Sequence, residues 1–176
     1  GAHLEQAVLS DSSFERCDFT RACLKRTRLS GSRFTSAKFD QADLVSADLQ
    51  GCDLRRASFR QALLRGAILI GTDLYKAKLD RAHLKYADLT RANLESAVLK
   101  NASLPKVNMT ECVLRGADMR GGTCSGSTLK NADFSGASLL GTRFSHSNLV
   151  GADFTNAKLI GTNLENADLG HATFHE

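Results

Sequence analysis

Large apolar residues recur at every fifth position along the whole chain. The series begins at Leu4 and has 35 positions, of which 23 are Leu and 9 are Phe; the other three are Met109, Met119 and Cys124. Two residues before each lies a small residue, which is Ala at 22 of the 35 positions. A period of five matches neither a helix nor a strand, but residues two apart point the same way on an extended segment. Each pentad is therefore predicted to be a short extended piece that buries one small and one large side chain.

The slot two residues after each large residue is predicted to be a turn. Eleven of the 14 Gly residues, from Gly31 to Gly161, occupy this slot, and four Asn residues share it. Gly and Asn adopt positive φ at low cost, as the third residue of a type II turn requires, and Pro105 lies one residue before the slot, where such a turn favours it. Repeated turns of this kind coil the backbone into a parallel β-solenoid.

Several pentads share a common motif, including Ala42-Asp43-Leu44, Ala92-Asn93-Leu94 and Ala167-Asp168-Leu169. The chain thereby resembles the pentapeptide-repeat family, whose consensus is Ala-(Asp/Asn)-Leu-X-X, over residues 2–176. The resemblance implies an all-β fold: a right-handed parallel β-helix, a quadrilateral solenoid with four pentapeptides per coil and nearly nine coils. Spacing alone does not separate three-sided from four-sided coils. Residues 1–176 are expected to form a single pentapeptide-repeat β-helix domain.

Two parts of the repeat depart from an ideal solenoid. Terminal repeats usually need a polar cap, yet the pattern begins at residue 2 and still runs at Phe174. We therefore expect either a domain excised from a longer protein or a homo-oligomer formed by end stacking. In the stretch Val107–Cys124, Gly122 and Cys124 replace larger residues, so the core is predicted to be underfilled. Tolerated drift and a hinge both remain open for this stretch.

No grouping of residues predicts catalysis. On coils of four pentads, His3, Cys23 and Asp43 form one outward column, but parallel side chains on successive coils do not converge on a substrate atom or a metal. The order is also wrong, because the base should lie between the nucleophile and the carboxylate. We expect no catalytic residue, no metal and no cofactor. The chain is therefore not expected to be an enzyme.

The five cysteines are predicted to be free thiols. Their odd number and the lack of CxxC spacing favour neither a disulfide framework nor a zinc site, which fits a reducing, cytoplasmic location. Cys23 points outward and is the thiol expected to react. The remaining four are predicted to be inward: Cys17, Cys52, Cys112 and Cys124.

Charge is distributed unevenly over the four expected sides. We number them by their first large residue: side 1 from Leu4, side 2 from Leu9, side 3 from Phe14 and side 4 from Phe19. Sides 1 and 4 sum to +3 and +4, and sides 2 and 3 to −2 and −1. The neighbouring sides 1 and 4 thus form a basic edge, interrupted by Asp40 and Asp80. We define it as Arg21, Lys25, Arg26, Lys38, Arg60, Arg65, Lys78, Arg81, Lys85, Lys100 and Arg120, with Arg143 and Lys158 further along.

The expected function is a non-catalytic binding scaffold that presents a rod-like surface, above all the basic edge, to a protein partner. Leu140 and Ile160, one coil apart in one column, form a candidate apolar contact. The resemblance supplies an alternative, because the best-known members of the family mimic DNA and protect or inhibit type II topoisomerases. The net charge of +4 disfavours it, since 19 acidic residues face 23 basic ones. Binding of nucleic acid is disfavoured because only Tyr75 and Tyr86 offer exposed rings. No apolar run is long enough to span a membrane.

Overall fold

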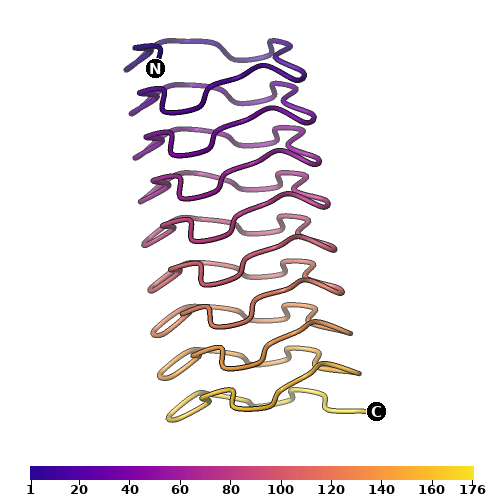
Figure 1. Ribbon diagram of the computed structural model, residues 1–176. Helices are drawn as coiled ribbons and strands as arrows, with labels where there is room; N and C mark the ends of the chain where they lie inside the picture. The colour runs from indigo at the N-terminus through magenta and orange to yellow at the C-terminus, as the bar shows by residue number, and fades with distance from the viewer.

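The computed structural model describes residues 1–176 as one rod of stacked coils, with the two chain ends at opposite ends of the rod (Figure 1). Every β-bridge is parallel and joins residues 20 positions apart, as in Cys23↔Asp43 and Asp43↔Leu63. One coil therefore contains four pentads, and a three-sided coil is excluded. Sides 1 to 4 are the four sides of this coil.

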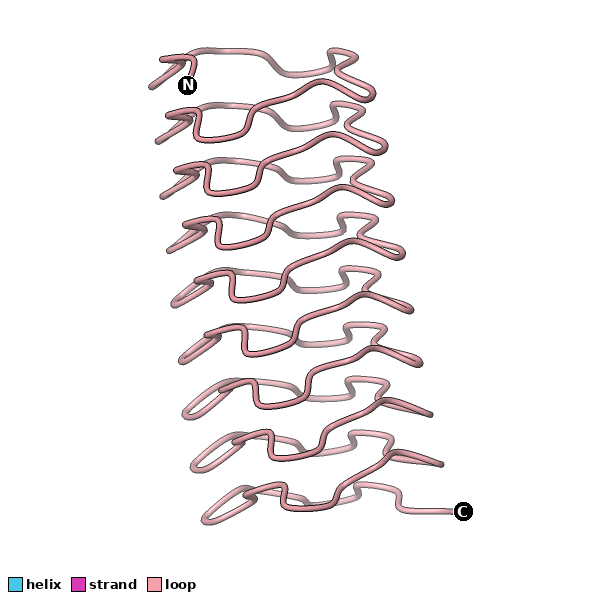
Figure 2. Cartoon of the chain, in the orientation of Figure 1, coloured by secondary structure: helices cyan, strands magenta, loops and turns pink.

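The chain contains no helix and no continuous strand, and all of it is drawn as loops and turns (Figure 2). Each pentad contributes one bridging residue, the one before its large residue, and then turns. Asp43 N–H donates to the carbonyl of Ala22 at 2.9 Å, and Leu44 N–H donates to that of Leu63 at 2.8 Å. These hydrogen bonds link each coil to both of its neighbours. The solenoid is therefore stabilised by contacts between stacked coils and not by long continuous strands.

Every turn slot from Gln6 to His171 has a left-handed backbone, with φ between 53° and 69°. The predicted positive φ is confirmed, but non-glycine residues hold 23 of these slots. The left-handed conformation costs such a residue about 1–2 kcal/mol. The ladder offsets part of this cost, because the slot residue also bonds to the next coil, as when Arg91 N–H donates to the carbonyl of Thr110 at 2.9 Å.

Asp or Asn precedes the large residue in 14 of the 35 pentads, and it has a structural role there. The backbone N–H of the residue after the large one bonds to no backbone carbonyl, and the Asp or Asn side chain accepts it instead. Ser135 N–H thus donates to Asp133 at 3.0 Å, and Glu95 N–H donates to Asn93 at 3.1 Å. This local bond explains why short acceptors recur at this position.

Polar residues in the small inward slots also find partners. Ser127, Thr142 and Cys112 each donate to the carbonyl of a large residue 23 positions earlier, at 2.9, 2.9 and 2.7 Å. No buried side-chain nitrogen or oxygen lacks a hydrogen-bond partner. Because the unpaired group would otherwise carry a desolvation cost, this bond is what allows Ser, Thr or Cys to replace Ala there.

The core is a continuous column of large and small side chains from Ala22 to Phe154. Phenylalanine rings stack on successive coils: Phe39 lies 5.1 Å from Phe19 and 4.8 Å from Phe59 between ring centroids, both nearly parallel. Such offset pairs add to the energy of simple burial. The core therefore gives the rod a rigid axis on which surface columns are displayed.

The predicted underfilling of the stretch Val107–Cys124 produces no groove in the structure. Its inward residues are all buried, and none of them lines one of the three grooves. A Cβ added at Gly122 would lie 2.9 Å from the carbonyl oxygen of Met119, which leaves no unused space for a methyl group. The bridges continue through Asn108↔Thr128 and Asp118↔Ser138, so nothing in the ladder marks a hinge.

Candidate binding surface

The predicted basic edge divides between two corners of the rod, one on each border of side 1. The turns after side 1 form the first corner, which carries Lys25, Arg26, Arg65 and Lys85. The turns after side 4 form the fourth corner, which carries Arg21, Arg60, Arg81, Lys100 and Arg120. Lys38 and Lys78 lie on side 4 itself, as their bridges to Asp18 and Ser58 show. Side 1 therefore separates two groups of cations.

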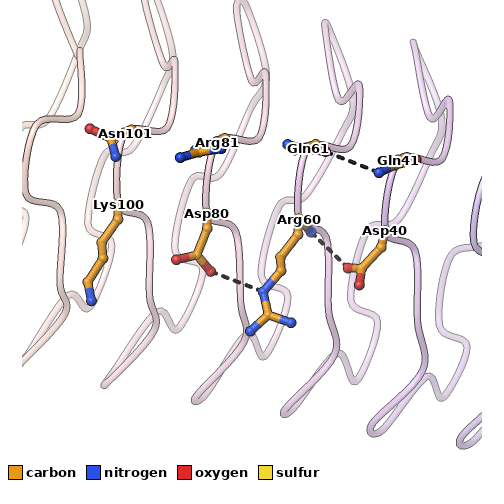
Figure 3. Close-up of a pocket in the computed structure, with 8 residues that line it drawn as sticks. All are labelled: Asp40, Gln41, Arg60, Gln61, Asp80, Arg81, Lys100 and Asn101. Carbon is orange, nitrogen blue, oxygen red and sulfur yellow. Dashed lines mark hydrogen bonds and ion pairs between the residues drawn. The ribbon is translucent and has the colours of Figure 1, made fainter.

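The fourth corner neutralises much of its own charge. It contains a groove of about 430 Å³ lined by no hydrophobic residue, in which acids and bases alternate along one column (Figure 3). Arg60 Nε lies 3.6 Å from Asp80, while Lys100 and Arg120 lie 3.3 and 2.7 Å from Asp118. These pairs are solvent-exposed, so each contributes little stability, but together they reduce the field that a partner would meet.

Asp40, in the same groove, is held by hydrogen bonds from the neighbouring coil. Its carboxylate accepts the hydroxyl of Ser58 and, at 3.0 Å, the backbone N–H of Arg60 (Figure 3). Ser58 occupies the position where 14 of the 35 pentads carry Asp or Asn, so Asp40 supplies the missing acceptor from the coil before. Gln41 and Gln61 continue the chain of polar contacts, with the amide of Gln41 donating to Gln61 at 3.1 Å.

The first corner retains more free charge. Lys25 pairs with Asp43 at 3.2 Å, but Arg26, Arg65 and Lys85 make no ion pair. A second groove, of about 360 Å³, runs along this corner and is lined by Glu5, Gln6, Lys25, Arg26, Val45, Ser46 and Arg65.

Tyr86 and Lys106 also lie at the first corner, although the predicted basic edge omits both. Lys85 Nζ lies 4.9 Å from the centroid of the Tyr86 ring and Lys106 Nζ lies 5.8 Å from it. Both distances are within the range of a cation–π contact. This contact could have been predicted from the sequence once the coil length is known, because Tyr86 and Lys106 are 20 residues apart in the same turn slot.

The predicted apolar pair lies further along the rod, in the column of the fourth corner. Ile160 is 78% exposed, whereas Leu140 is half-buried. Their pentads are adjacent, as the bridge Ser138↔Lys158 shows. Only one of the two side chains therefore offers a large apolar surface.

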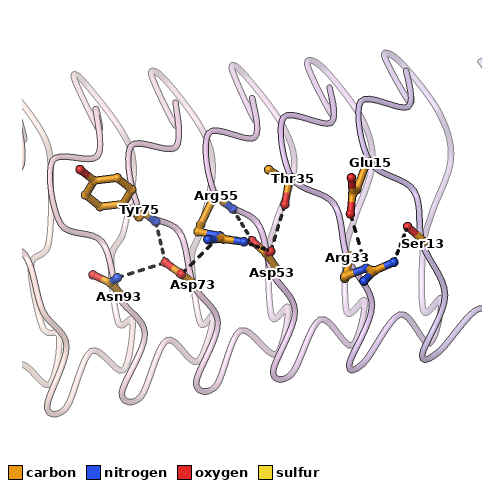
Figure 4. Close-up of polar contacts among 9 residues, drawn as sticks. All are labelled: Ser13, Glu15, Arg33, Thr35, Asp53, Arg55, Asp73, Tyr75 and Asn93. Carbon is orange, nitrogen blue, oxygen red and sulfur yellow. Dashed lines mark hydrogen bonds and ion pairs between the residues drawn. The ribbon is translucent and has the colours of Figure 1, made fainter.

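The opposite side of the rod carries a polar network. Arg55 donates two hydrogen bonds to Asp53, at 2.8 and 2.6 Å, and lies 3.7 Å from Asp73 (Figure 4). Thr35 donates a hydroxyl hydrogen bond to Asp53 at 3.0 Å, and Thr35 and Arg55 border an open groove with Tyr75. The hydrogen bonds from Arg55 are the main cause that lowers the pKa of Asp53 to about 2.

Asp53→Asn is expected to lower the thermal midpoint at pH 7 but not at pH 2. The folded-state pKa of Asp53, about 2, lies below its usual 3.8, so the carboxylate stabilises the fold above about pH 4 and loses that contribution as the pH falls toward 2. Thermal melts of the wild type and the variant at both pH values measure this. An equal deficit at pH 7 and pH 2 would contradict the assignment.

The column of His3, Cys23 and Asp43 does not form a reactive group. The thiol of Cys23 donates to Glu5 at 2.8 Å, and this bond is the main reason that its pKa is raised. Asp43 is bound to Lys25 and to the N–H of Val45. Nowhere do three His, Cys, Asp or Glu side chains gather as a metal site would need.

Two expectations for the cysteines need correction. Cys17 occupies an inward register of the first coil in the structure but is exposed there, and Cys23 is only half-exposed. With its raised pKa, Cys23 is not the thiol best placed to react. Cys52, Cys112 and Cys124 are buried as predicted, and burial raises the pKa of each to about 12.

Fold and surface together define a repeat protein whose side chains stand in columns on a rigid four-sided β-solenoid. Its grooves are all open and surface-lying, and no helix in the structure could cross a membrane. The family described as pentapeptide repeats matches residues 1–35, 42–81, 57–95 and 77–116, and the related pentapeptide repeat region matches residues 107–176. The chain belongs to the pentapeptide-repeat family. The predicted right-handed quadrilateral β-helix is thereby confirmed.

Solved structures of pentapeptide repeat proteins resemble the chain over nearly its whole length. HetL of the cyanobacterium Nostoc sp. strain PCC 7120, a protein involved in the regulation of heterocyst differentiation, is 30% identical, with 97% of this chain and 88% of HetL covered and a TM-score of 0.43. A trypsin-treated form of QnrB1, a plasmid-mediated fluoroquinolone resistance protein, is 26% identical, with 99% and 87% covered and a TM-score of 0.51. A search of curated proteins gave no match.

Proposed function

We propose that the chain is a non-catalytic scaffold that binds a protein partner through the neighbouring sides 1 and 4 and the two corners that border side 1. The observation that carries this proposal is the set of basic-edge residues that make no ion pair, Arg21, Arg26, Arg65, Lys78, Arg81 and Lys85. Their charges remain available to an acidic partner, and they lie together on the two neighbouring sides whose net charge is positive. Complementary charge of this kind favours fast and specific association.

The solenoid suits such a role because it holds its surface residues in place. Each turn is bonded to the coils beside it, and the core is closed from Ala22 to Phe154. Binding to a preorganised surface requires little ordering of backbone, so less of the interaction free energy is lost.

The alternative of DNA mimicry has less support from the surface. A DNA mimic needs a dense row of free negative charges. Here Asp43, Asp53, Asp118 and Asp133 each lie within 4.0 Å of a Lys or Arg nitrogen. With 23 basic and 19 acidic residues, no side offers such a row.

Reversal of charge on the proposed side should abolish capture of the partner. The immobilised chain is incubated with nuclease-treated extract of the source cells, and captured proteins are identified by mass spectrometry. Arg65→Glu, Lys78→Glu and Arg81→Glu are combined in one variant. The control combines Arg28→Glu, Arg56→Glu and Lys130→Glu, which are likewise exposed, unpaired cations and include one left-handed slot, as does the test set.

We expect a protein that the wild type and the control retain and the test variant loses. Retention by all three, or loss from both variants, would contradict the proposed surface. Capture of a type II topoisomerase by all three would instead favour DNA mimicry. Loss of all capture on nuclease treatment would point to nucleic acid.

A further inference from the structure

Three large apolar side chains are exposed together in the middle of the rod. Leu63 is 40% exposed on side 1, Ile68 is 39% exposed on side 2, and Tyr86 is 51% exposed at the corner between them, one coil further on. The other large exposed apolar residues, Val8, Ile160 and Phe174, lie toward the ends of the chain. The three central residues therefore form one patch that wraps the first corner.

The turn slot before Tyr86 in its column carries no side chain. Gly66 occupies that slot on the coil before, and a Cβ added there would meet only the hydroxyl of Ser46, at 3.7 Å. Gly66 therefore leaves the approach to the corner from that coil uncrowded.

Cations without acidic partners surround the patch. Arg65 lies between Leu63 and Ile68 in the chain, and Lys85 and Lys106 lie 4.9 and 5.8 Å from the centroid of the Tyr86 ring. None of the three makes an ion pair.

Acidic residues approach the patch from two columns. Asp43 precedes Leu63 and already binds Lys25 at 3.2 Å. Asp48 and Asp88 flank Ile68 on side 2, and Asp88 accepts both the N–H and the hydroxyl of Thr90. The positive charge is thus concentrated at the corner and toward side 1. On side 2 it ends at the acidic residues Asp48 and Asp88.

Tyr86 adopts a costly conformation to be there. Its φ is 63°, in the left-handed region that a bulky side chain rarely adopts. Its neighbours in the column are Gly66, which adopts this φ freely, and Lys106, whose φ is 57°. An exposed aromatic ring between cations has the composition of an interaction hot spot, where Tyr and Arg are enriched.

We propose that this corner, the Tyr86 patch, binds an acidic amphipathic segment of the protein partner. The large apolar side chains of the segment pack against Leu63, Ile68 and Tyr86, while its carboxylates pair with Arg65, Lys85 and Lys106. The inference rests on the proposed function, because it names the part of the surface and the chemistry of the partner. The charges argue for acidic residues, and the exposed Leu63, Ile68 and Tyr86 argue for apolar ones.

The test uses a fluorescein-labelled synthetic peptide that alternates Glu with Leu and Phe, with binding followed by fluorescence anisotropy. Tyr86→Gly is expected to weaken binding by about tenfold or more, as loss of a hot-spot aromatic does. Its thermal midpoint should not fall, because Gly relieves the left-handed strain, so lost binding cannot be ascribed to unfolding. Lys76→Gly is the matched control: it relieves the same strain, at φ 56°, on another corner, and should leave the affinity unchanged.

Two further peptides separate the contributions of charge and apolar contact. Replacement of each Glu by Gln, or of each Leu and Phe by Ser, should weaken binding to the wild type. Wild-type affinity in Tyr86→Gly, or equal affinity for the Gln peptide, would overturn the proposal. So would displacement of the peptide by a single-stranded oligonucleotide at equal charge concentration, since the patch would then be a phosphate site.

The same variant distinguishes failure of this inference from failure of the proposed function. A captured partner that is lost on reversal of Arg65, Lys78 and Arg81 but retained by Tyr86→Gly would leave the scaffold role standing and reject the patch. A partner lost by both variants, together with weakened peptide binding, is the result we expect.

Discussion

Replacing Phe39 with Ala is expected to lower the free energy of unfolding by about 3–5 kcal/mol. Phe39 is fully buried and lies between two parallel rings, those of Phe19 and Phe59, with the Phe34 ring edge-on at 5.2 Å. Truncation would leave a cavity in the axis of the rod and break the stack. Urea denaturation followed by circular dichroism measures the loss.

Phe39→Leu is the control, because Leu is the commonest residue at this position of the pentad. A shape change between large apolar residues should cost less than about 1.5 kcal/mol. Since each coil contacts only its neighbours, the Ala variant should also show a broader transition, with the coils before Phe39 unfolding first. A Leu variant as stable as the wild type would show that the ring stack contributes nothing beyond volume, and equal costs for Ala and Leu would contradict the predicted cavity.

Gly71→Pro should destabilise the rod by about 3 kcal/mol or more. Gly71 has a φ of 63°, which the proline ring forbids, and its N–H donates to the carbonyl of Thr90 at 2.9 Å, a bond that Pro cannot make. A Cβ at Gly71 would meet nothing within 4 Å, so steric overlap with other side chains plays no part. The backbone alone decides the result.

Two milder variants at the same position calibrate this effect. Gly71→Ala should cost about 1–2 kcal/mol, the usual cost of left-handed φ in an L-residue. Gly71→Asn should cost less, because Asn tolerates this region. Denaturation curves should therefore rank the variants Asn, Ala, Pro in order of increasing loss. A Pro variant as stable as the Ala variant would show that this turn can change its conformation.

The candidate surface could be predicted from the sequence only in part. Arg65 and Lys85 belong to the predicted basic edge, and the structure places both at the first corner. Tyr86 and Lys106 complete that corner but are missing from the prediction, which was drawn from charge on whole sides. Conversely, Arg60 and Lys100 are in the basic edge, yet Asp80 and Asp118 pair with them.

The sequence by itself determined which residues point inward, where the chain turns, and that the turn slot has positive φ. A strict period of five over the whole chain leaves one register in which the Leu and Phe residues can be buried together, so these features follow from local rules. The same rules could not determine how many pentads close a coil.

Only the tertiary structure decided the number of sides and which charges neutralise one another. Lys25 pairs with Asp43 across 18 positions, Arg60 pairs with Asp80 across 20, and Thr142 bonds to the carbonyl of Met119 across 23. Each of these contacts exists because four pentads make one coil, which brings residues about 20 apart onto adjacent coils. No local preference sets that distance, so the free cations and the exposed patch of the first corner appear only once the coils are stacked.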